Sequence, residues 1–219
     1  MTCQMTKIAP SILSADFGRL GSEVEKLEKS GADWVHVDVM DGVFVPNITI
    51  GPGVVKSIRR FSKLPFDVHL MIVEPEKFVD AFADAGSDII TIHLEATKDV
   101  RGTLKKIRSR GKRAGLSINP ETPFSSIVPY VGDLDLLLIM TVNPGFGGQE
   151  FKTECLAKIR EARRYASDNG TVFDIEVDGG INSITGELCV TAGANVLAAG
   201  NALFGSGDMR SEIAKWKSF

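Results

Sequence analysis

Two histidines and two aspartates stand at the ends of three separate strand-like runs of this sequence. His36 and Asp38 alternate within one run, His69 lies at the end of a second, and Asp178 closes a third, directly before two glycines. Imidazole nitrogens and carboxylate oxygens together suit Zn2+, Fe2+, Co2+ or Mn2+ better than Ca2+ or Mg2+. The same groups can act as acid and base on opposite sides of a substrate. The pattern therefore indicates proton transfer next to a metal-polarised carbonyl.

The alternation of side chains along a strand predicts which further groups share the face of this set. Charged groups inside a barrel are costly unless they are paired or bound to metal, so their number is informative. An isolated histidine on a strand is usually only a packed, hydrogen-bonded residue. We expect Glu176, which lies deeper, to be buried and hydrogen-bonded and not a ligand. The predicted inward-facing groups are His36, Asp38 and Met40 in one run, Asp67, His69 and Met71 in the next, and Glu176 and Asp178 in a later one.

Glycine-rich turns follow the last three strand-like runs. Glycine allows backbone N–H groups to approach a phosphate closely, and the loops after strands seven and eight are the usual phosphate site of (β/α)8 barrels. We therefore predict a phosphate cradle, and the glycines of the first turn could also be hinges of a lid. The three turns are residues 142–149 with Gly145, Phe146, Gly147 and Gly148, then Asp178-Gly179-Gly180, and then Gly200-Asn201.

The remaining histidine and three methionines also stand at strand ends. His93 closes the fourth run and could line the pocket, although a packed structural role is the more common one for such a residue. Met40, Met71 and Met140 each end a strand, and methionine usually fills gaps in a core. The alternative is a soft apolar layer that keeps water away from an anionic intermediate.

Short β-branched runs alternate with amphipathic stretches along the whole chain, which predicts eight β-strands each followed by a helix or turn. Eight such units in 219 residues favour a single (β/α)8 TIM barrel over residues 1–219. A doubly wound sheet usually has fewer strands and a GxGxxG turn, which is absent after the first run. The predicted strands are 8–13, 34–40, 66–71, 89–93, 113–118, 134–140, 173–177 and 195–199, and the helical stretches are 20–30, 53–61, 75–85, 100–110, 153–167 and 183–191.

Similar phrases recur just before three strands and predict one reused helix-to-strand turn. They are Ser30-Gly31-Ala32-Asp33, Ala85-Gly86-Ser87-Asp88 and Ala192-Gly193-Ala194-Asn195. Glycine is the residue that most often ends a helix in the left-handed conformation. We expect helix C-caps at five glycines: Gly31, Gly86, Gly111, Gly170 and Gly193.

Composition narrows the class of protein and its location. A net charge of −3 gives no support for nucleic-acid binding. Three cysteines, Cys3, Cys155 and Cys189, lack metal-type spacing, and an odd number does not suit a disulfide framework. No apolar run reaches the ~18–20 residues of a membrane-spanning helix, and residues 1–7 lack the apolar segment of a signal peptide. We expect a cytoplasmic protein that does not bind membranes, and an organelle-targeting segment removed on maturation would leave no trace here.

Five stretches resemble the ribulose-phosphate 3-epimerase family, and the similarity spans essentially the whole chain. The family is a metal-dependent (β/α)8 barrel that interconverts D-ribulose 5-phosphate and D-xylulose 5-phosphate. Its members are homo-oligomers, so the resemblance implies a dimer or a hexamer and a phosphorylated ketose as substrate. The matching stretches are Ala9 to Asp16, His36 to Gly42, Asp67 to Met71, Asn143 to Gln149 and Glu176 to Gly180.

The resemblance assigns roles to the residues that match the family's motifs. It implies Zn2+ or Fe2+ as the metal, with Mn2+ or Co2+ as alternatives. Asp38 would take the C3 proton from one face, giving an enediolate, and Asp178 would return a proton to the other face. The implied metal ligands are His36, Asp38, His69 and Asp178. The implied substrate-binding residues are Ser11, His69, Gly145, Phe146, Gly147, Gly148, Asp178, Gly179, Gly180, Gly200 and Asn201. Asn201 departs from the family's usual Gly-Ser pair, which keeps a backbone contact to phosphate but removes a hydroxyl contact.

Other functions of such a barrel fit the sequence less well. A Schiff-base aldolase needs a lysine at a strand end, and the predicted strand ends offer none. An orotidine-phosphate-type decarboxylase needs an Asp-x-Lys-x-x-Asp pattern, whereas the matching stretch from Asp38 to Asp41 has no lysine. A non-catalytic sugar-phosphate-binding barrel would be expected to lose one of the paired carboxylates, and both are present. The nearest alternative is an epimerase of the same mechanism for a six-carbon ketose phosphate such as allulose 6-phosphate.

Overall fold

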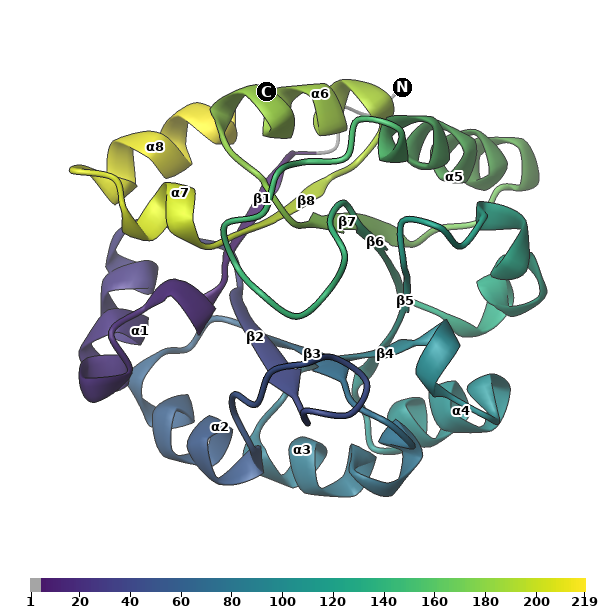
Figure 1. Cartoon of the computed structure of the whole chain (residues 1–219), viewed down its shortest axis with the longest axis horizontal. Coiled ribbons are helices and arrows are strands. Elements are labelled where there is room, and N and C mark those ends of the chain that lie inside the picture. The colour runs from purple at the N-terminus through teal and green to yellow at the C-terminus, as the bar shows by residue number, and fades with distance from the viewer. Residues whose placement is uncertain (1–4) are drawn as a thin grey trace.

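The computed structural model describes residues 5–219, and in this range eight parallel strands form one sheet that curves into a barrel (Figure 1). Each strand from β2 to β8 lies beside its neighbours in the chain, and β1 pairs with β8. A parallel bridge between Ser11 and His36 joins the first strand to the second and closes the ring. The strands are β1 Lys7–Pro10, β2 Val35–Met40, β3 Phe66–Met71, β4 Ile89–His93, β5 Arg113–Ile118, β6 Leu136–Met140, β7 Asp174–Asp178 and β8 Val196–Ala199.

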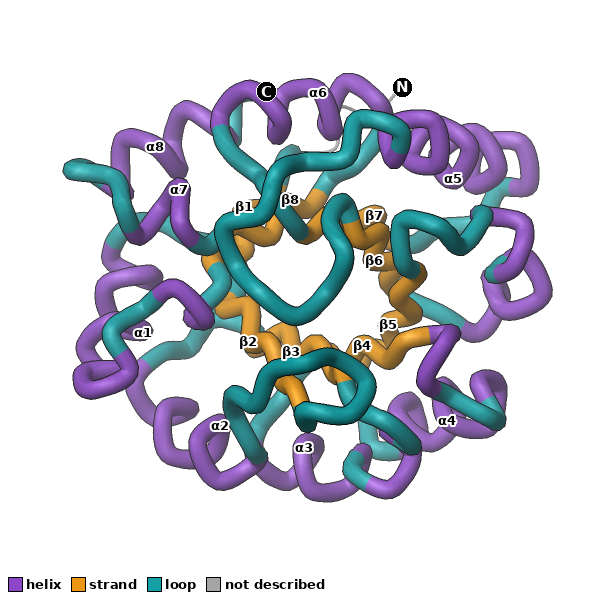
Figure 2. The backbone as a smooth tube through the Cα atoms, viewed as in Figure 1, coloured by secondary structure: helices purple, strands orange, loops and turns teal. Residues whose placement is uncertain are grey.

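Helices surround the barrel, and two long loops cross its near mouth, one after β2 and one after β6 (Figure 2). Between β5 and β6 the described chain runs through 3-10 turns in place of an α-helix, at Phe124–Ser126 and Val128–Asp133. The helices are α1 Leu20–Lys29, α2 Pro52–Ile58, α3 Val79–Ala85, α4 Val100–Ser109, α5 Cys155–Asn169, α6 Ser183–Ala192, α7 Asn201–Phe204 and α8 Met209–Trp216. In residues 5–219 no helix combines the length and apolar character needed to cross a bilayer.

The predicted (β/α)8 barrel is confirmed, with differences at some element ends. The first strand stops at Pro10 and not at residue 13, because the Ser11 hydroxyl accepts the N–H of Leu13 and the chain turns at Ile12–Ser14. The stretch 75–85 is likewise divided, into a 3-10 turn at Pro75–Lys77 and helix α3. Cys155 and Cys189 are free, buried thiols, and Cys3 lies outside the described residues.

The recurring turn before alternate strands has a common function in the fold. In each case a side-chain oxygen at the end of the turn accepts the backbone N–H at the start of the preceding strand. Asp135 provides a fourth example that the sequence phrase did not show. The pairs are Asp33 with Ile8, Asp88 with Phe66, Asp135 with Ala114, and Asn195 with Ile175, all at 2.7–2.8 Å. The five predicted C-cap glycines all have the expected left-handed conformation.

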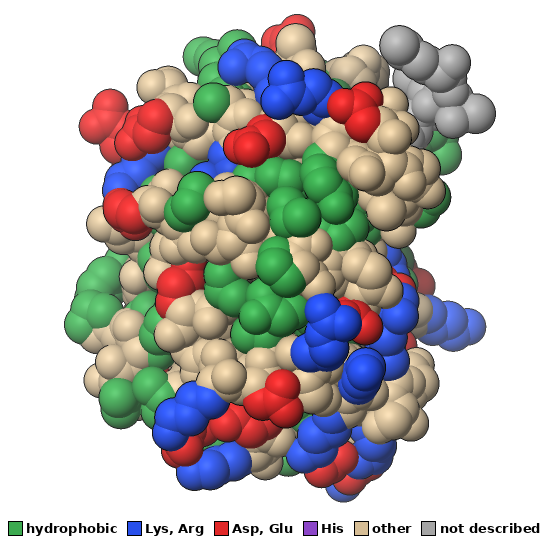
Figure 3. Space-filling view, turned by 90° about the vertical axis from the view of Figure 1, so that its right-hand side faces the viewer, with side chains coloured by type: hydrophobic (Ala, Val, Ile, Leu, Met, Phe, Trp, Pro, Cys, Tyr) green, Lys and Arg blue, Asp and Glu red, His purple; other side chains and the backbone are tan. Residues whose placement is uncertain are grey.

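Apolar and polar side chains are layered along the barrel axis. Side chains such as Trp34, Leu136 and Leu138 fill the part of the lumen toward the amino ends of the strands. Below them Asp174 accepts ion pairs from Lys7 and Arg113 and closes that end. Outside, basic and acidic side chains mix over the face that carries α4 and α5 (Figure 3). The three histidines are all fully buried, so the chemistry predicted from the sequence lies inside the barrel mouth.

Candidate active site

Four side chains from three strands meet at the carboxyl end of the barrel. Strand β2 contributes His36 and Asp38, β3 contributes His69, and β7 contributes Asp178. One donor atom from each of the four lies within 4.8 Å of the others. The pairing of β2 with β3 sets Asp38 beside His69 and His36 beside Asp67, so the sheet register itself brings the two strands' groups together. The structure therefore assembles the predicted set.

The two nitrogen atoms of this set face the two carboxylates, and only His69 Nδ1 has hydrogen-bond geometry toward one of them, Asp38 Oδ1. His36 Nε2 lies 3.3 Å from Asp38 Oδ1 and 3.9 Å from Asp178 Oδ2. His69 Nδ1 lies 3.2 Å from the same Asp38 oxygen and 3.9 Å from the same Asp178 oxygen. Among the described residues the buried His36 Nε2 has no partner with hydrogen-bond geometry, and such an unpaired nitrogen is costly. The donor set fits a divalent cation, which would satisfy it.

A carboxylate behind His36 fixes that ring. Asp67 is fully buried and its Oδ2 lies 2.6 Å from His36 Nδ1. This bond places the ring proton on Nδ1 and leaves Nε2 free as a ligand atom, an arrangement that is usual for metal-binding histidines. Glu176 is fully buried, as expected, and approaches Nδ1 at 3.4 Å. Its oxygens have no hydrogen-bond partner in the described part of the chain, so the expected hydrogen bond is not made.

The protein environment shifts the pKa values of the two aspartates in opposite directions. Burial by itself raises the pKa of Asp38, but the charges and hydrogen bonds of His36 and His69 outweigh it and hold that pKa well below the ordinary value. Burial, and then the negative charge of Asp38, raises the pKa of Asp178 to about 7. Burial also lowers the pKa of His69 to about 4. Two carboxyl groups with opposed shifts are typical of a base and an acid in one site.

Asp38 divides its two oxygens between two neighbourhoods. Oδ1 faces the histidines, while Oδ2 accepts a hydrogen bond of 2.5 Å from Ser11 Oγ. Ser11 lies at the end of β1 and lines the pocket with Asp38. One oxygen is thus available to a metal while the other is directed toward the pocket, a division that the sequence could not show.

The pocket above this set has most of the predicted residues on its wall. His69 is an exception, because it is fully buried and does not line the pocket, so its expected substrate contact stays a prediction. Met40, Met71 and Met140 are all on the wall, which favours the apolar-layer interpretation over simple core filling. The predicted residues that line the pocket are Ser11, Asp38, Gly145, Phe146, Gly147, Gly148, Asp178, Gly179, Gly180, Gly200 and Asn201.

Two of these glycines are required by close packing. A Cβ atom at Gly179 would lie 2.4 Å from a methyl carbon of Val142, and the residue has a φ of +118°. A Cβ atom at Gly200 would lie 2.3 Å from Ser14 Oγ. The backbones after β7 and β8 therefore come to the pocket wall without side chains, where their N–H groups can reach a ligand.

Comparison with known proteins decides the family. A model described as the ribulose-phosphate 3 epimerase family matches residues 7–204. The ribulose-phosphate 3-epimerase of Bacillus subtilis (strain 168) is 51% identical over 212 residues, which are 96% of this chain and 98% of the relative. The chain belongs to the ribulose-phosphate 3-epimerase family. The resemblance predicted from the sequence is confirmed.

Further relatives agree with this membership of the ribulose-phosphate 3-epimerase family. The chloroplastic ribulose-5-phosphate-3-epimerase of Arabidopsis thaliana is 49% identical over 208 residues, 94% of this chain and 74% of the relative. Among solved structures, a mutant tryptophan synthase alpha-subunit from Pyrococcus furiosus has a TM-score of 0.70 and 15% identity, over 98% of this chain and 96% of that one. At this identity the likeness concerns the fold alone.

Asn201, where this chain departs from the family's usual Gly-Ser, connects two parts of the pocket. Its Oδ1 accepts a hydrogen bond of 2.6 Å from Ser14 Oγ, at the turn after β1. Its Nδ2 lies against the β6 loop, only 2.7 Å from where a Cβ atom of Gly148 would be. The side chain thus fills the space between this turn and the loop. Sequence analysis did not identify Ser14 as a pocket residue.

The loop after β2 also contributes residues that sequence analysis missed. Asn47 Nδ2 donates a hydrogen bond of 2.9 Å to the carbonyl oxygen of Gly145 in the β6 loop. The Phe44 ring lies 4.9 Å from the His93 ring, measured between centroids, and covers it. His93 itself is buried and does not line the pocket, so it has the packed role. Neither Phe44 nor Asn47 belongs to a recognisable motif, since their importance arises from a contact between distant loops.

Proposed function

We propose that this protein inverts C3 of D-ribulose 5-phosphate to give D-xylulose 5-phosphate, with Asp38 and Asp178 as the two proton carriers. The observation that supports this most is the pair of aspartates on β2 and β7, at one pocket, with opposed pKa shifts. Inversion requires a proton to leave one face of a carbon and another to arrive at the opposite face. Two separate carboxyl groups can do this, whereas a single base returns the proton to the face from which it came.

Asp38 has the properties of the proton acceptor in this direction. Its low pKa keeps it as a carboxylate, and its Oδ2 points to Ser11 at the pocket wall. Asp178, with a pKa of about 7, can hold a proton at neutral pH and deliver it to the other face of C3. In the reverse direction the two groups exchange roles.

His36, Asp38, His69 and Asp178 would hold one divalent ion, for which Zn2+ or Fe2+ suits the mixed nitrogen and oxygen donors, with Mn2+ or Co2+ as alternatives. When bound, such an ion draws charge from the substrate carbonyl and makes the neighbouring C–H more acidic. The unpaired His36 Nε2 supports this assignment.

The remaining predicted residues would hold and enclose the sugar phosphate. Gly179, Gly180 and Gly200 follow β7 and β8 and line the pocket, and the loops after these two strands are where such barrels usually bind phosphate. The β6 loop with Gly145, Phe146, Gly147 and Gly148 would cover the substrate. Phe146 is 55% exposed, so its ring is available to close over the substrate. The three methionines would keep water from the carbanionic intermediate.

The decisive experiment measures epimerisation and deuterium incorporation at C3 of the sugar in deuterated water. The protein, saturated with Zn2+ or Fe2+, should convert ribulose 5-phosphate to xylulose 5-phosphate and place deuterium at C3. Asp38→Asn and Asp178→Asn should each reduce turnover by at least ~100-fold, the usual size of a lost general acid or base. Asp84→Asn, which changes a 71% exposed aspartate on α3, is the matched control and should have no effect.

Each outcome of that experiment has a definite meaning. Bound metal must be measured in every variant, so that loss of the ion is not mistaken for loss of the proton carrier. Full activity of either active-site variant would remove that aspartate from its role. Faster turnover of allulose 6-phosphate than of ribulose 5-phosphate would contradict the five-carbon assignment.

We further propose, from the family resemblance, a cytoplasmic homo-oligomer, either a dimer or a hexamer. Large apolar side chains on one part of the surface support self-association: Val43 is 72% exposed and Ile48 is 77% exposed, both in the loop after β2. Light scattering on the purified protein would give the number of chains directly.

A further inference from the structure

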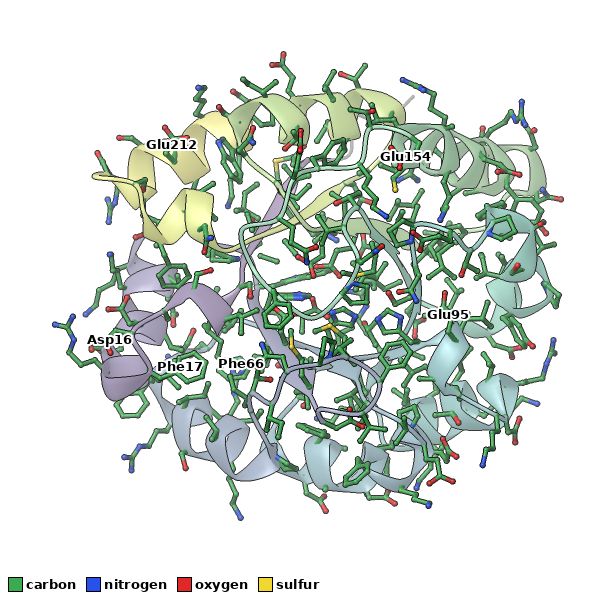
Figure 4. All side chains as sticks on the ribbon, in the orientation of Figure 1. Asp16, Phe17, Phe66, Glu95, Glu154 and Glu212 are labelled. Carbon is green, nitrogen blue, oxygen red and sulfur yellow. The ribbon has the colours of Figure 1, made fainter. Side chains whose placement is uncertain are left out.

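Within the described chain, the wall of the pocket carries no lysine or arginine that could bind a phosphate. Many side chains with nitrogen ends extend outward from the ring of helices, away from the centre of the barrel (Figure 4). A phosphate in the pocket must therefore be bound by backbone N–H groups, by neutral side chains or by the metal. The direction of each backbone N–H group on the wall then decides whether that group can contribute.

Three successive carbonyl oxygens in the turn after β7 are bound by threonine hydroxyl groups. The Thr141 hydroxyl donates to the carbonyl oxygen of Asp178 at 2.9 Å and to that of Gly179 at 2.6 Å. The Thr185 hydroxyl donates to the carbonyl oxygen of Gly180 at 2.9 Å. The backbone N–H of Thr141 adds a bond of 2.8 Å to the Asp178 oxygen. Each peptide unit of this turn is thus held by its oxygen.

Both threonines lie behind the wall of the pocket and not on it. Thr141 is fully buried, Thr185 belongs to the first turn of α6, and neither lines the pocket. The bound carbonyl oxygens therefore point away from the pocket. In a trans peptide unit the C=O and N–H groups point in opposite directions. The N–H groups on the pocket side belong to the next residues, Gly179, Gly180 and Ile181, all of which line the pocket.

Two of these three N–H groups are free to bind a ligand. The Gly179 N–H group interacts with the Asp178 carboxylate. Among the described residues the N–H groups of Gly180 and Ile181 have no hydrogen-bond acceptor. Successive backbone N–H groups that face the same side form a concave site for anions, as in many phosphate sites.

The glycines make this turn possible but also leave it easy to distort. Gly179 and Gly180 have φ angles of +118° and +66°, a region that residues with a Cβ atom rarely adopt. Glycine passes readily between positive and negative φ, so the peptide unit between the two could rotate and exchange its C=O and N–H groups. A carbonyl oxygen would then face the phosphate and repel it. The hydroxyl of Thr141 opposes this rotation because it holds the oxygen of that unit.

We propose that Thr141 and Thr185 are positioning residues for the sugar phosphate. Their hydroxyl groups hold the carbonyl oxygens behind the wall, and the N–H groups of Gly180 and Ile181 bind the phosphate on the other side. The two threonines act through the backbone and do not touch the substrate. The identity of this ligand rests on the proposed function, whereas the orientation of the peptide units is a property of the protein alone.

Matched substitutions separate the hydroxyl group from the space that the side chain fills. Thr141→Val removes the hydroxyl and keeps the shape, whereas Thr141→Ser keeps the hydroxyl. Thr185→Val and Thr185→Ser form a second pair, in which the hydroxyl also accepts the N–H of Asn182 at 2.9 Å. Thr103→Val is the control, because Thr103 is also buried and its hydroxyl donates to the carbonyl oxygen of Asp99 at the start of α4.

The experiment titrates inorganic phosphate into Zn2+-saturated protein labelled with 15N in glycine and isoleucine. In the unchanged protein the amide NMR signals of Gly180 and Ile181 should shift on binding. Thr141→Val should raise the Kd for phosphate about 10-fold, the expected effect of losing one hydrogen bond to a charged group. Thr141→Ser and Thr103→Val should change the Kd by less than about twofold, because the hydrogen bonds of the turn remain. Bound Zn2+ and the Tm are measured for each variant.

The results separate this inference from the proposed function. Signals of Gly180 and Ile181 that do not respond to phosphate in the unchanged protein would overturn the inference, even if no variant folds. A folded Thr141→Val protein that keeps the original Kd would also overturn it, as would a serine variant that binds as weakly as the valine variant. If Thr141→Val does not fold, the Thr185 pair decides in the same way. If phosphate binds as expected but ribulose 5-phosphate is not epimerised, the proposed function fails and the positioning role stands.

Discussion

At the scale of single residues, the site depends on each carboxyl group having a distinct environment. Asp38 accepts a hydrogen bond from Ser11 Oγ on one oxygen and faces the two imidazoles with the other. Asp178 is close to the negative charge of Asp38 and keeps 17% of its side chain exposed. The same residue type thus becomes a strong acid in one place and a weak acid in the other, because burial disfavours charge and donors restore it.

The raised pKa of Asp178 predicts an unusual dependence of stability on pH. Its pKa rises from 3.8 to about 7 on folding, so the folded state retains a proton that the unfolded state loses. The stability contributed by this group is complete below pH 3.8 and is lost as the pH rises toward 7. At about 1.4 kcal/mol per unit of pKa, the loss is at most about 4 kcal/mol.

Denaturation of metal-stripped protein between pH 4 and pH 7.5 measures this effect. Asp178→Asn should remove the loss, so the variant should gain stability relative to the unchanged protein as the pH rises. Taking the difference between the two proteins cancels groups that titrate equally in both. Parallel curves would show that Asp178 titrates normally in the fold.

Much of the residue-level site could be predicted from the sequence, because strand alternation and the rule for barrel strand ends are both local. His36 and Asp38, two positions apart, must share a face. The contact between His69 and His93 could not be found in this way, because it depends on how β3 lies beside β4. The separate tasks of the two oxygens of Asp38 likewise depend on Ser11, which lies directly after β1 and therefore far from Asp38 in the sequence.

At the scale of elements, the recurring turns explain why the strands are aligned well enough to build the site. A side chain such as Asp33 or Asp88 ties the end of each turn to the start of the previous strand. This fixes the stagger of strands in pairs, and stagger decides which side chains share a layer in a barrel. The glycine in these turns was readable from the sequence, whereas the hydrogen bond made by the aspartate was not.

The loops over the barrel mouth are held to each other by a few polar contacts. The β2 loop and the β6 loop are joined by the bond between Asn47 and the carbonyl oxygen of Gly145, and the Asn201 side chain lies against the β6 loop from the other side. Glycines at 145 and 148 have positive φ angles, which lets this loop turn sharply. A loop held by a few polar contacts can open for exchange of substrate and product.

Asn47→Ala should therefore loosen the β6 loop without unfolding the barrel. One net hydrogen bond is worth about 1 kcal/mol, which corresponds to about a fivefold rise in KM for the sugar phosphate. Steady-state kinetics on the metal-saturated protein measure this, and hydrogen exchange of residues 143–149 should become faster. Asn169→Ala removes a similar bond, to Tyr165 at the end of α5, and should leave KM unchanged. An unchanged KM in Asn47→Ala would mean that this bond has no part in holding the substrate.

At the scale of the whole molecule, apolar side chains fill the barrel toward the amino ends of the strands, and the active-site histidines and carboxylates lie at the carboxyl ends. Asp174 with Lys7 and Arg113 closes the other end by direct ion pairs. The active-site carboxylates have no comparable lysine or arginine partner among the described ion pairs, and face histidines in its place. The negative charge at this mouth therefore favours binding of a cation, which would also join strands β2, β3 and β7.

Removal of the metal should consequently lower the stability of the entire barrel. A ligand that binds only the folded state stabilises it by about 2.7 kcal/mol at a free concentration of 100 times its Kd. For a chain of this size each kcal/mol changes the Tm by roughly 2–4 °C, so a chelator should lower the Tm by about 5–11 °C and Zn2+ should restore it. His36→Gln, which removes the unpaired nitrogen, should abolish most of this response. A chelator effect of the same size in that variant would place the stabilising ion elsewhere, because a site built from three strands loses affinity when one ligand is removed.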